Sequence, residues 1–337
     1  MKPTFLLWPL LAISAFSCAE VPDEGMEFSH KDWDLVCHRT GECTAMGYSP
    51  GDGIDGISVA LRRKAGPREP FEGNLAFADI SGDMPVAPVK LLLDGEVVGE
   101  LGQNDEWMFR LNAYQSRVLV TALAGSPQIE FVDARKRAWV LSGAGATAVL
   151  VKMDALQQRV GTPGAAIKTG DGNEDFVPGP QPTLPPIERP PLVDTLPGDT
   201  LLANDPALRK ALGNTLDERH PCPDLLAGKD LHIERLDEHR LLVSTQCSAN
   251  SFNTATGFWV SEDRPPYLSK LVTEAGTLFD RPYAQLGSWQ MQSPRGDCLV
   301  RTAWVWDGVS FVLASYAGYI RCRGFTNGAW GVSSYMR

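Results

Sequence analysis

The cysteines of this chain constrain its fold more than any other feature. Seven occur among 337 residues, and the first lies in an N-terminal segment that has the pattern of an export signal. Residues 1–19 contain one basic residue, then an apolar run, then Ser17-Cys18-Ala19, which predicts cleavage before Glu20. An even number of cysteines in an oxidising compartment predicts a fold held by disulfides. The six that remain after cleavage are Cys37, Cys43, Cys222, Cys247, Cys298 and Cys322.

Proximity along the chain favours the pairs Cys37–Cys43, Cys222–Cys247 and Cys298–Cys322 among the possible pairings. Each of these bridges would close a loop inside one domain. No two cysteines are separated by two residues, so the sequence lacks the patterns of a thioredoxin-type redox site and of the usual zinc knuckle. We therefore expect structural disulfides, no metal and no cofactor.

The signal leaves two outcomes open for the exported protein. Simple cleavage would release it into the periplasm or the medium. Lipidation at Cys18 would instead anchor it to a membrane, although Ala15-Phe16-Ser17 is a poor lipoprotein box because Phe16 is bulky where small residues are usual. Both outcomes predict a periplasmic or secreted location, free or anchored through Cys18.

The charge of the chain argues against two classes of partner. Its formal net charge is −10, and nucleic acid requires clustered Lys and Arg. The same acidity opposes electrostatic docking on anionic lipid. After the export signal, no apolar run approaches the roughly 20 residues that a membrane-spanning helix needs. We expect no nucleic-acid partner and no membrane span.

A proline-rich stretch, residues 170–199, divides the sequence. Each proline removes a ladder donor and favours extended backbone, which predicts a semi-rigid linker. It separates a β-rich domain with two helices, residues 27–169, from a β-rich, tryptophan-rich domain, residues 200–337. The predicted fold class is α+β, mainly antiparallel β, with two disulfide-stapled domains.

The apolar patterns place the elements of each domain. In the first we expect strands at 32–38, 43–49, 57–63, 129–132 and 138–141, a hairpin turn at Asp94-Gly95, and helices at 112–124 and 146–160. In the second we expect a helix at 205–212, strands at 231–236, 241–247, 257–261, 289–292, 299–306 and 310–314, and a hairpin turn at Asp307-Gly308.

Four motifs of the chain are Lys31 to Cys37, Cys43 to Tyr48, Met153 to Gly161 and Cys322-Arg323-Gly324. With these motifs the chain resembles a bacterial exported family, domain-of-unknown-function family 1176. The family usually shows Gly-Ala-Tyr-Asn after its fourth cysteine, and this chain has Asn-Ser-Phe-Asn at 250–253. The first domain is also similar to invasion-associated locus B proteins. The resemblance implies export, two domains and structural disulfides, and it implies no established activity.

The sequence favours binding over catalysis, and no catalytic residue is predicted. The expected ligand is a partner protein, an envelope polymer or an incoming enzyme such as lysozyme. Trp306, Trp330 and Asn253 are the candidate binding residues. The alternative is a hydrolase of envelope polysaccharide, because aromatic faces stack on sugars and paired carboxylates cleave them. Its candidate carboxylates are Asp280, Asp297 and Asp307.

Overall fold

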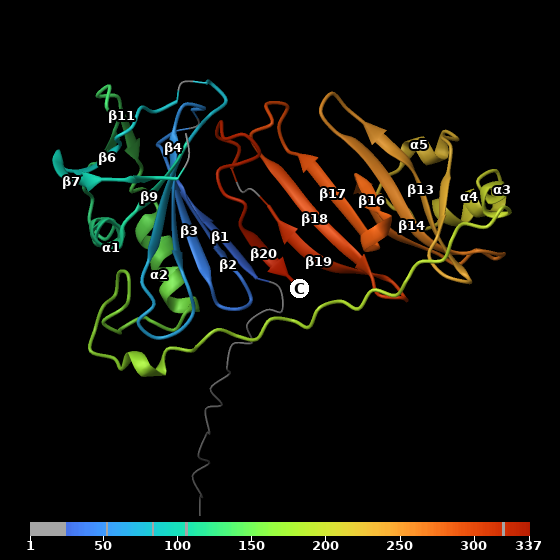
Figure 1. The fold of residues 1–337 in the computed structure, drawn as a ribbon, viewed down its shortest axis with the longest axis horizontal. Coiled ribbons are helices and arrows are strands. Elements are labelled where there is room, and N and C mark those ends of the chain that lie inside the picture. The colour runs from blue at the N-terminus through green and yellow to red at the C-terminus, as the bar shows by residue number, and fades with distance from the viewer. Residues whose placement is uncertain (1–24, 52, 83, 105–106, 319–320) are drawn as a thin grey trace, which may run out of the picture.

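The computed structural model describes residues 25–51, 53–82, 84–104, 107–318 and 321–337 (Figure 1). The expected export signal at 1–19 and the possible lipidation site Cys18 lie outside these residues. The described chain is built mainly from antiparallel sheets, as the sequence predicts. None of its helices is long and apolar enough to cross a bilayer.

The N-terminal half is centred on a seven-stranded antiparallel sheet. Its strands, in spatial order, are β1 (Met26–His30), β2 (Trp33–Cys37), β3 (Cys43–Tyr48), β4 (Ile57–Arg63), β5 (Glu72–Phe77), β9 (Met108–Leu111) and β8 (Gly102–Gln103). Every residue of β2 and β3 is buried, so this sheet is covered on both faces.

A smaller four-stranded sheet and two helices lie against the first sheet. The sheet has the order β11 (Ala138–Leu141), β10 (Ile129–Val132), β6 (Lys90–Leu93) and β7 (Glu96–Glu100), and the helices are α1 (Ala113–Ala122) and α2 (Ala146–Leu156). Asp94 and Gly95 both have positive φ, which confirms the predicted hairpin turn between β6 and β7. Asn112 begins α1 through a capping box with Gln115.

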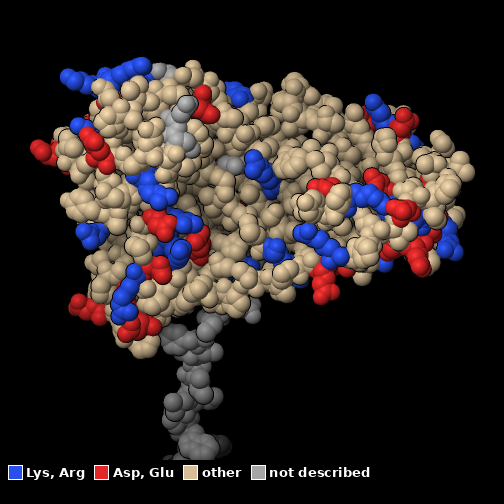
Figure 2. Space-filling model, viewed as in Figure 1, with Lys and Arg blue, Asp and Glu red and all other residues tan. Residues whose placement is uncertain are grey.

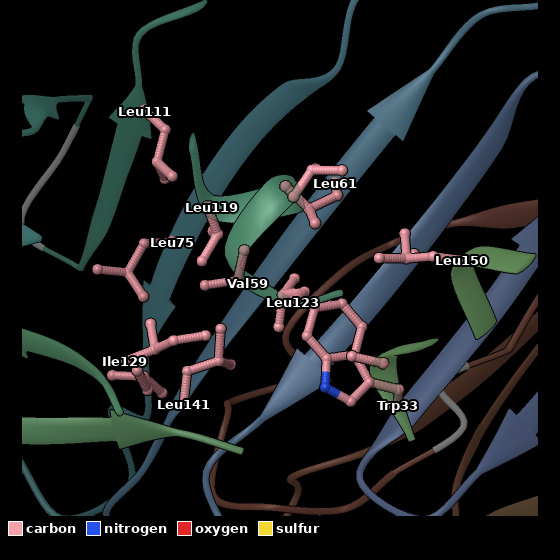
Figure 3. Packing of buried hydrophobic residues seen from close by; sticks show 14 of the residues in the cluster. Trp33, Val59, Leu61, Leu75, Leu111, Leu119, Leu123, Ile129, Leu141 and Leu150 are labelled. Atoms are coloured by element: carbon pink, nitrogen blue, oxygen red, sulfur yellow. The ribbon is translucent and has the colours of Figure 1, made fainter. Parts of the chain in front are cut away.

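The core of this half lies between the first sheet and these covering elements. Figure 3 shows leucines from β4, β5 and α1 in one cluster, with Trp33 at its side. The buried indole of Trp33 donates a hydrogen bond to the carbonyl of Ser142, 2.6 Å away. Helix α2 is held to β4 by a fully buried ion pair, Arg63–Asp154, at 2.6 Å. Burial lowers the pKa of Arg63 to about 10, so this arginine stays charged at neutral pH.

The C-terminal half contains a four-stranded and a five-stranded antiparallel sheet. The first has the order β12 (His232–Arg235), β13 (Arg240–Ala249), β14 (Thr254–Glu262) and β15 (Ser269–Gly276). The second has the order β16 (Leu278–Asp280), β17 (Gln285–Met291), β18 (Leu299–Trp306), β19 (Phe311–Ala317) and β20 (Ser333–Met336). The helices α3 (Asp199–Leu202), α4 (Pro206–Gly213) and α5 (Pro223–Leu226) precede them.

Two apolar clusters stabilise these sheets. One packs α4 and α5 against β13 and β14, with Trp259 at its centre. The other joins β13 and β14 to one face of the five-stranded sheet, around Leu286 and Trp306. The two sheets also meet where the Ser288 hydroxyl donates a hydrogen bond to the Ala275 carbonyl, 2.5 Å away.

Three disulfides join Cys37 to Cys43, Cys222 to Cys247 and Cys298 to Cys322, which are the pairs that proximity along the chain favours. The first links β2 to β3, and the second links the start of α5 to β13. The third links the residue before β18 to the stretch that follows β19. All three join segments that the sheets already hold close together.

The proline-rich stretch runs along one side of the molecule between the two halves, below the sheets in Figure 1. Residues 178–198 form no helix or strand, and most of their side chains are exposed. The backbone touches both halves, because Gln181 bonds to Thr40 and Val193 bonds to Leu236. At its end, the buried carboxylate of Asp199 pairs with Arg235 at 2.6 Å.

The C-terminal segment, residues 321–332, packs on the outer face of the first sheet. Its apolar side chains Phe325, Ala329, Trp330 and Val332 cover residues of β2 to β5. Gly324 has a positive φ, and a Cβ there would overlap the carbonyl of Ile54. Only glycine therefore fits where the segment crosses the chain.

A charged pair fixes the start of this segment. Arg321 donates two hydrogen bonds to the carboxylate of Asp34, at 2.7 and 2.9 Å, and a third to the carbonyl of Lys31. Asp34 lies on β2 and is completely buried. The Arg321 and Arg323 guanidiniums both lie over the ring of Tyr48, at 5.6 and 5.5 Å from its centre.

Replacing Arg321 by methionine should loosen the C-terminal segment. Asp34 would be left buried and unpaired, which costs about 3–5 kcal/mol. Hydrogen exchange of residues 322–332 should rise strongly in this variant. Arg62→Met is the matched control, because the Arg62–Glu72 pair is exposed and contributes about 0–1 kcal/mol. Equal protection of the segment in both variants would contradict the assignment.

The division into two domains stays a prediction, which proteolysis can test. Glutamyl endopeptidase should cut after Glu188, which is exposed and outside any helix or strand. We expect the two fragments to elute together in native buffer, because the C-terminal segment still binds the first sheet, and to separate in denaturant. Glu188→Gln should resist this cut. Cleavage elsewhere with this stretch intact would contradict the division into two domains. Separation in native buffer would contradict the contact of the C-terminal segment with the first sheet.

Candidate functional site

Trp306 does not form a binding surface, so the expectation for this residue is wrong. Its ring is completely buried, 5.5 Å from the ring of Phe311, and Arg240 covers it at 5.1 Å. Although Trp306 adjoins the Asp307-Gly308 turn, its position on β18 points it into the cluster with Leu286. The alternation of the strand decides its burial, and the turn does not.

Trp330 and Asn253 also have structural contacts. Trp330 is half-buried in the C-terminal segment, and its indole donates a hydrogen bond to the Ser58 hydroxyl at 2.7 Å. Asn253 lies between β13 and β14, where its amide donates to the Met291 carbonyl at 2.8 Å. Its side-chain oxygen accepts from the Met291 N–H at 2.9 Å. Asn253 therefore ties this hairpin to the end of β17.

Asp297 and Asp307, two of the carboxylates considered for hydrolysis, bond to nearby backbone. Asp307 accepts from the N–H groups of Val309 and Ser310, both at 2.8 Å, and so shapes the β18–β19 turn. Asp297 is completely buried and accepts from the N–H of Gly324 at 3.1 Å. Asp280 is half-buried at the end of β16. Through its bond to Gly324, Asp297 thus helps to hold the C-terminal segment in place.

The environment of Asp297 keeps it charged. Burial alone would raise the pKa of this carboxyl, but hydrogen bonds from Ser293 and Gly324 and the nearby Arg295 outweigh it and hold the pKa below its usual value. The sulfurs of Cys298 and Cys322 lie within 4.8 Å of its carboxylate. Because these sulfurs are joined to each other, neither is a thiolate that could bind a metal.

A groove beside β15 has a volume of about 580 Å³. One wall is the strand itself, and the other contains Asp217 and His220 from the loop after α4. Their side chains lie 2.9 Å apart, and this bond with His220, together with Arg219, lowers the pKa of Asp217 to about 2. Asp217 also accepts from the backbone of Arg219 and His220, so these contacts build a local turn.

A different surface displays an exposed tryptophan. Trp289 lies on β17 with 45% of its surface exposed. Its backbone is held by Thr277, whose hydroxyl accepts from the Trp289 N–H at 2.8 Å. The indole lies over Gly287, because a Cβ at that glycine would be 3.7–4.0 Å from three adjacent ring atoms. The ring therefore lies along the sheet, at van der Waals distance above Gly287.

Residues on neighbouring strands extend this surface. Arg301 of β18 is directly opposite Trp289, and Ala317 of β19 is opposite Arg301. In the next row Leu278 and Ala303 flank Gly287, and Ser315 is opposite Ala303. Opposite residues of an antiparallel pair share a face, so these side chains form one surface. We call it the Trp289 face: Leu278, Gly287, Trp289, Arg301, Ala303, Ser315 and Ala317.

The Trp289 face combines one aromatic ring, one cation and small residues. Arg301 is exposed. Among the seven residues that define the Trp289 face, all of them described by the structure, Arg301 is the one that carries a charge. Its guanidinium makes no ion pair or hydrogen bond with another described residue. On the side of the molecule shown in Figure 2, Lys and Arg are interspersed with Asp and Glu at both ends, and the middle is mostly uncharged. This view shows no broad basic patch of the kind that binds nucleic acid.

The sequence interpretation did not select Trp289, which it placed at the start of a strand at 289–292. The strand in fact begins at Gln285, so Trp289 is at its centre. One signal was available, namely a glycine two positions before the tryptophan. On a strand these residues share a face, so the ring has a small neighbour on its own strand.

The chain belongs to the family described as "Protein of unknown function (DUF1176)", whose model matches residues 27–337. It is similar to an uncharacterized protein, YpfG, of Escherichia coli (strain K12). The two are 26% identical over 345 residues, which cover 96% of this chain and 92% of the relative. No solved structure matches it. The likeness to invasion-associated locus B proteins stays an expectation from the sequence.

The buried position of Asp297 predicts a stability role. Asp297→Asn should lower the free energy of unfolding by about 1.5–3 kcal/mol, the range for hydrogen bonds to a charged group. Since the carboxyl has a lowered pKa, its contribution is present above about pH 4 and is lost as the pH falls. Urea unfolding at pH 7 and pH 3, with disulfides intact, should therefore show a difference from wild type that shrinks in acid.

Asp280→Asn is the matched control, because this carboxylate is only half-buried. It should unfold like the wild type at both pH values. An Asp297→Asn protein of unchanged stability that lost turnover on a glycan would instead support the hydrolase.

Proposed function

We propose that this chain is an exported protein of the cell envelope that binds an envelope polymer without catalysis, through the Trp289 face. The single observation that carries the proposal is the exposed indole laid over Gly287 and flanked by small side chains. An aromatic ring with one free face offers a flat apolar surface, on which the apolar face of a sugar can stack.

The shape of the Trp289 face favours a polymer over a protein partner or an incoming enzyme such as lysozyme. A stable protein interface buries about 800 Å² on each partner and relies on several clustered anchors. The Trp289 face offers one large exposed ring beside Gly287, Ala303, Ser315 and Ala317. A narrow polymer can bind to one such ring through any of its repeating sugar units.

The disulfides support an envelope location. Bridges such as Cys37–Cys43 persist in oxidising compartments and are rare in the cytosol. Together with the predicted export signal, they support a location in the periplasm or the medium, with an anchor at Cys18 as the alternative form. The proposed binding assigns no role to the carboxylates considered for hydrolysis, because Asp297 and Asp307 have structural partners.

Trp289→Ala should abolish most of the polymer binding. Loss of an aromatic anchor costs about 2 kcal/mol or more, which is roughly a thirtyfold loss of affinity. The measurement is cosedimentation with purified peptidoglycan sacculi and with purified envelope polysaccharide. Trp289→Phe should retain part of the binding, because it keeps a ring.

The matched control is Tyr114→Ala, since Tyr114 is equally prominent on α1, 55% exposed and distant in sequence from the Trp289 face. It should bind like the wild type. Absence of any binding by the wild type, or equal losses in the Trp289 and Tyr114 variants, would reject the proposal. Release of soluble sugar fragments from the polymer would indicate the hydrolase.

A further inference from the structure

The Trp289 face has an unbalanced charge that a neutral sugar would not use. Arg301 stands opposite Trp289 on the adjacent strand, so their Cβ atoms are about 4.5–5.5 Å apart. The guanidinium is exposed and makes no ion pair or hydrogen bond with another described residue.

We infer that the polymer bound at this face is an acidic glycan whose sugars carry carboxylates, such as a polyuronate. This inference rests on the proposed function and specifies the ligand class of the same site. A sugar ring stacked on Trp289 would present its substituents toward the neighbouring strand, where Arg301 lies. The guanidinium can then donate to the carboxylate in the bidentate geometry that arginine favours.

The charge of the face favours a carboxylate over a phosphate monoester. A sugar carboxylate carries one negative charge, which one guanidinium balances. A phosphate monoester carries between one and two charges and offers more acceptor oxygens. The other residues of the Trp289 face are apolar, apart from Ser315, so they supply no second cation. Arg301 alone therefore matches a carboxylate.

The floor of the face fits a chain that continues past the ring. Gly287, Ala303 and Ser315 are consecutive neighbours across β17, β18 and β19. Their small side chains keep the surface low along a path at right angles to the strands, beside the row that contains Trp289 and Arg301. A linear polysaccharide can follow this path with one residue stacked on Trp289.

The test compares two polymers that share one backbone and differ at the carboxyl group. Polygalacturonate and its fully methyl-esterified form share one backbone, and esterification removes the carboxylate charge. By affinity electrophoresis or calorimetry, the wild type should bind polygalacturonate at least fivefold more tightly than the ester. Raising the salt from about 50 mM to about 500 mM should remove most of this preference, because exposed charges are screened at this ionic strength.

Arg301→Gln should bind both polymers equally, at the level that the wild type shows for the ester. Arg301→Lys should restore part of the preference, because it keeps the charge but loses the bidentate geometry. The matched control is Arg117→Gln. Arg117 is an exposed arginine 5.9 Å from the ring of Tyr114, so it reproduces the aromatic–cation pairing away from the five-stranded sheet. It should behave like the wild type.

The outcomes separate the inference from the proposed function. Equal wild-type affinity for both polymers, lost in Trp289→Ala, would overturn the acidic ligand and keep the binding site. A preference for a phosphomannan over polygalacturonate would overturn the carboxylate. Binding of neither polymer, together with no binding to sacculi or envelope polysaccharide, would overturn both. Thermal unfolding of each variant establishes that it is folded, and Arg301→Gln should match the wild type because its side chain is exposed.

Discussion

The buried contact between Asp34 and Arg321 determines how the two ends of this chain are joined. Asp34 is the second residue of β2, and Arg321 follows the last long strand by a few residues. A completely buried carboxylate such as Asp34 is tolerated only when an ion-pair or hydrogen-bond partner satisfies it. Arg321 supplies that partner bidentately and positions the stretch that Cys322 links to Cys298. The apolar residues after it then cover the outer face of the first sheet.

Exposure of the tryptophans follows from strand register in the C-terminal sheet. Trp304 lies opposite Leu286, and Trp306 follows two positions later, so both point toward the cluster shared with β13 and β14. Trp289 is three positions after Leu286 on β17 and therefore occupies the other face. The same sheet thus uses some of its indoles as core and presents another to solvent. A binding function for this protein depends on that second face.

Much of the local structure could be predicted from the sequence. The strands Ile57–Arg63, Ile129–Val132, Ala138–Leu141 and Leu299–Trp306 have the expected bounds, because each has a strong apolar pattern. Strands β5 and β15 were missed, since Glu72–Phe77 and Ser269–Gly276 contain glycine and charged residues. Their pairing with β4 and β14 overrides these weak local preferences. Helix α2 ends at Leu156 rather than at 160. Asp154, in the last turn of this helix, pairs with Arg63.

By itself the sequence determined the mainly antiparallel fold, the disulfide pairs that proximity along the chain favours and the hairpin turns, because these depend on neighbours in the chain or on the alternation within a strand. Only the tertiary structure decided which aromatic rings reach solvent and what the carboxylates touch. Burial of Trp306, exposure of Trp289 and the contact of Asp297 with Gly324 all depend on segments that are distant in sequence. A turn residue such as Asp307 is predictable from its own neighbours. A surface such as the Trp289 face is assembled from four strands, and its composition is set by their register.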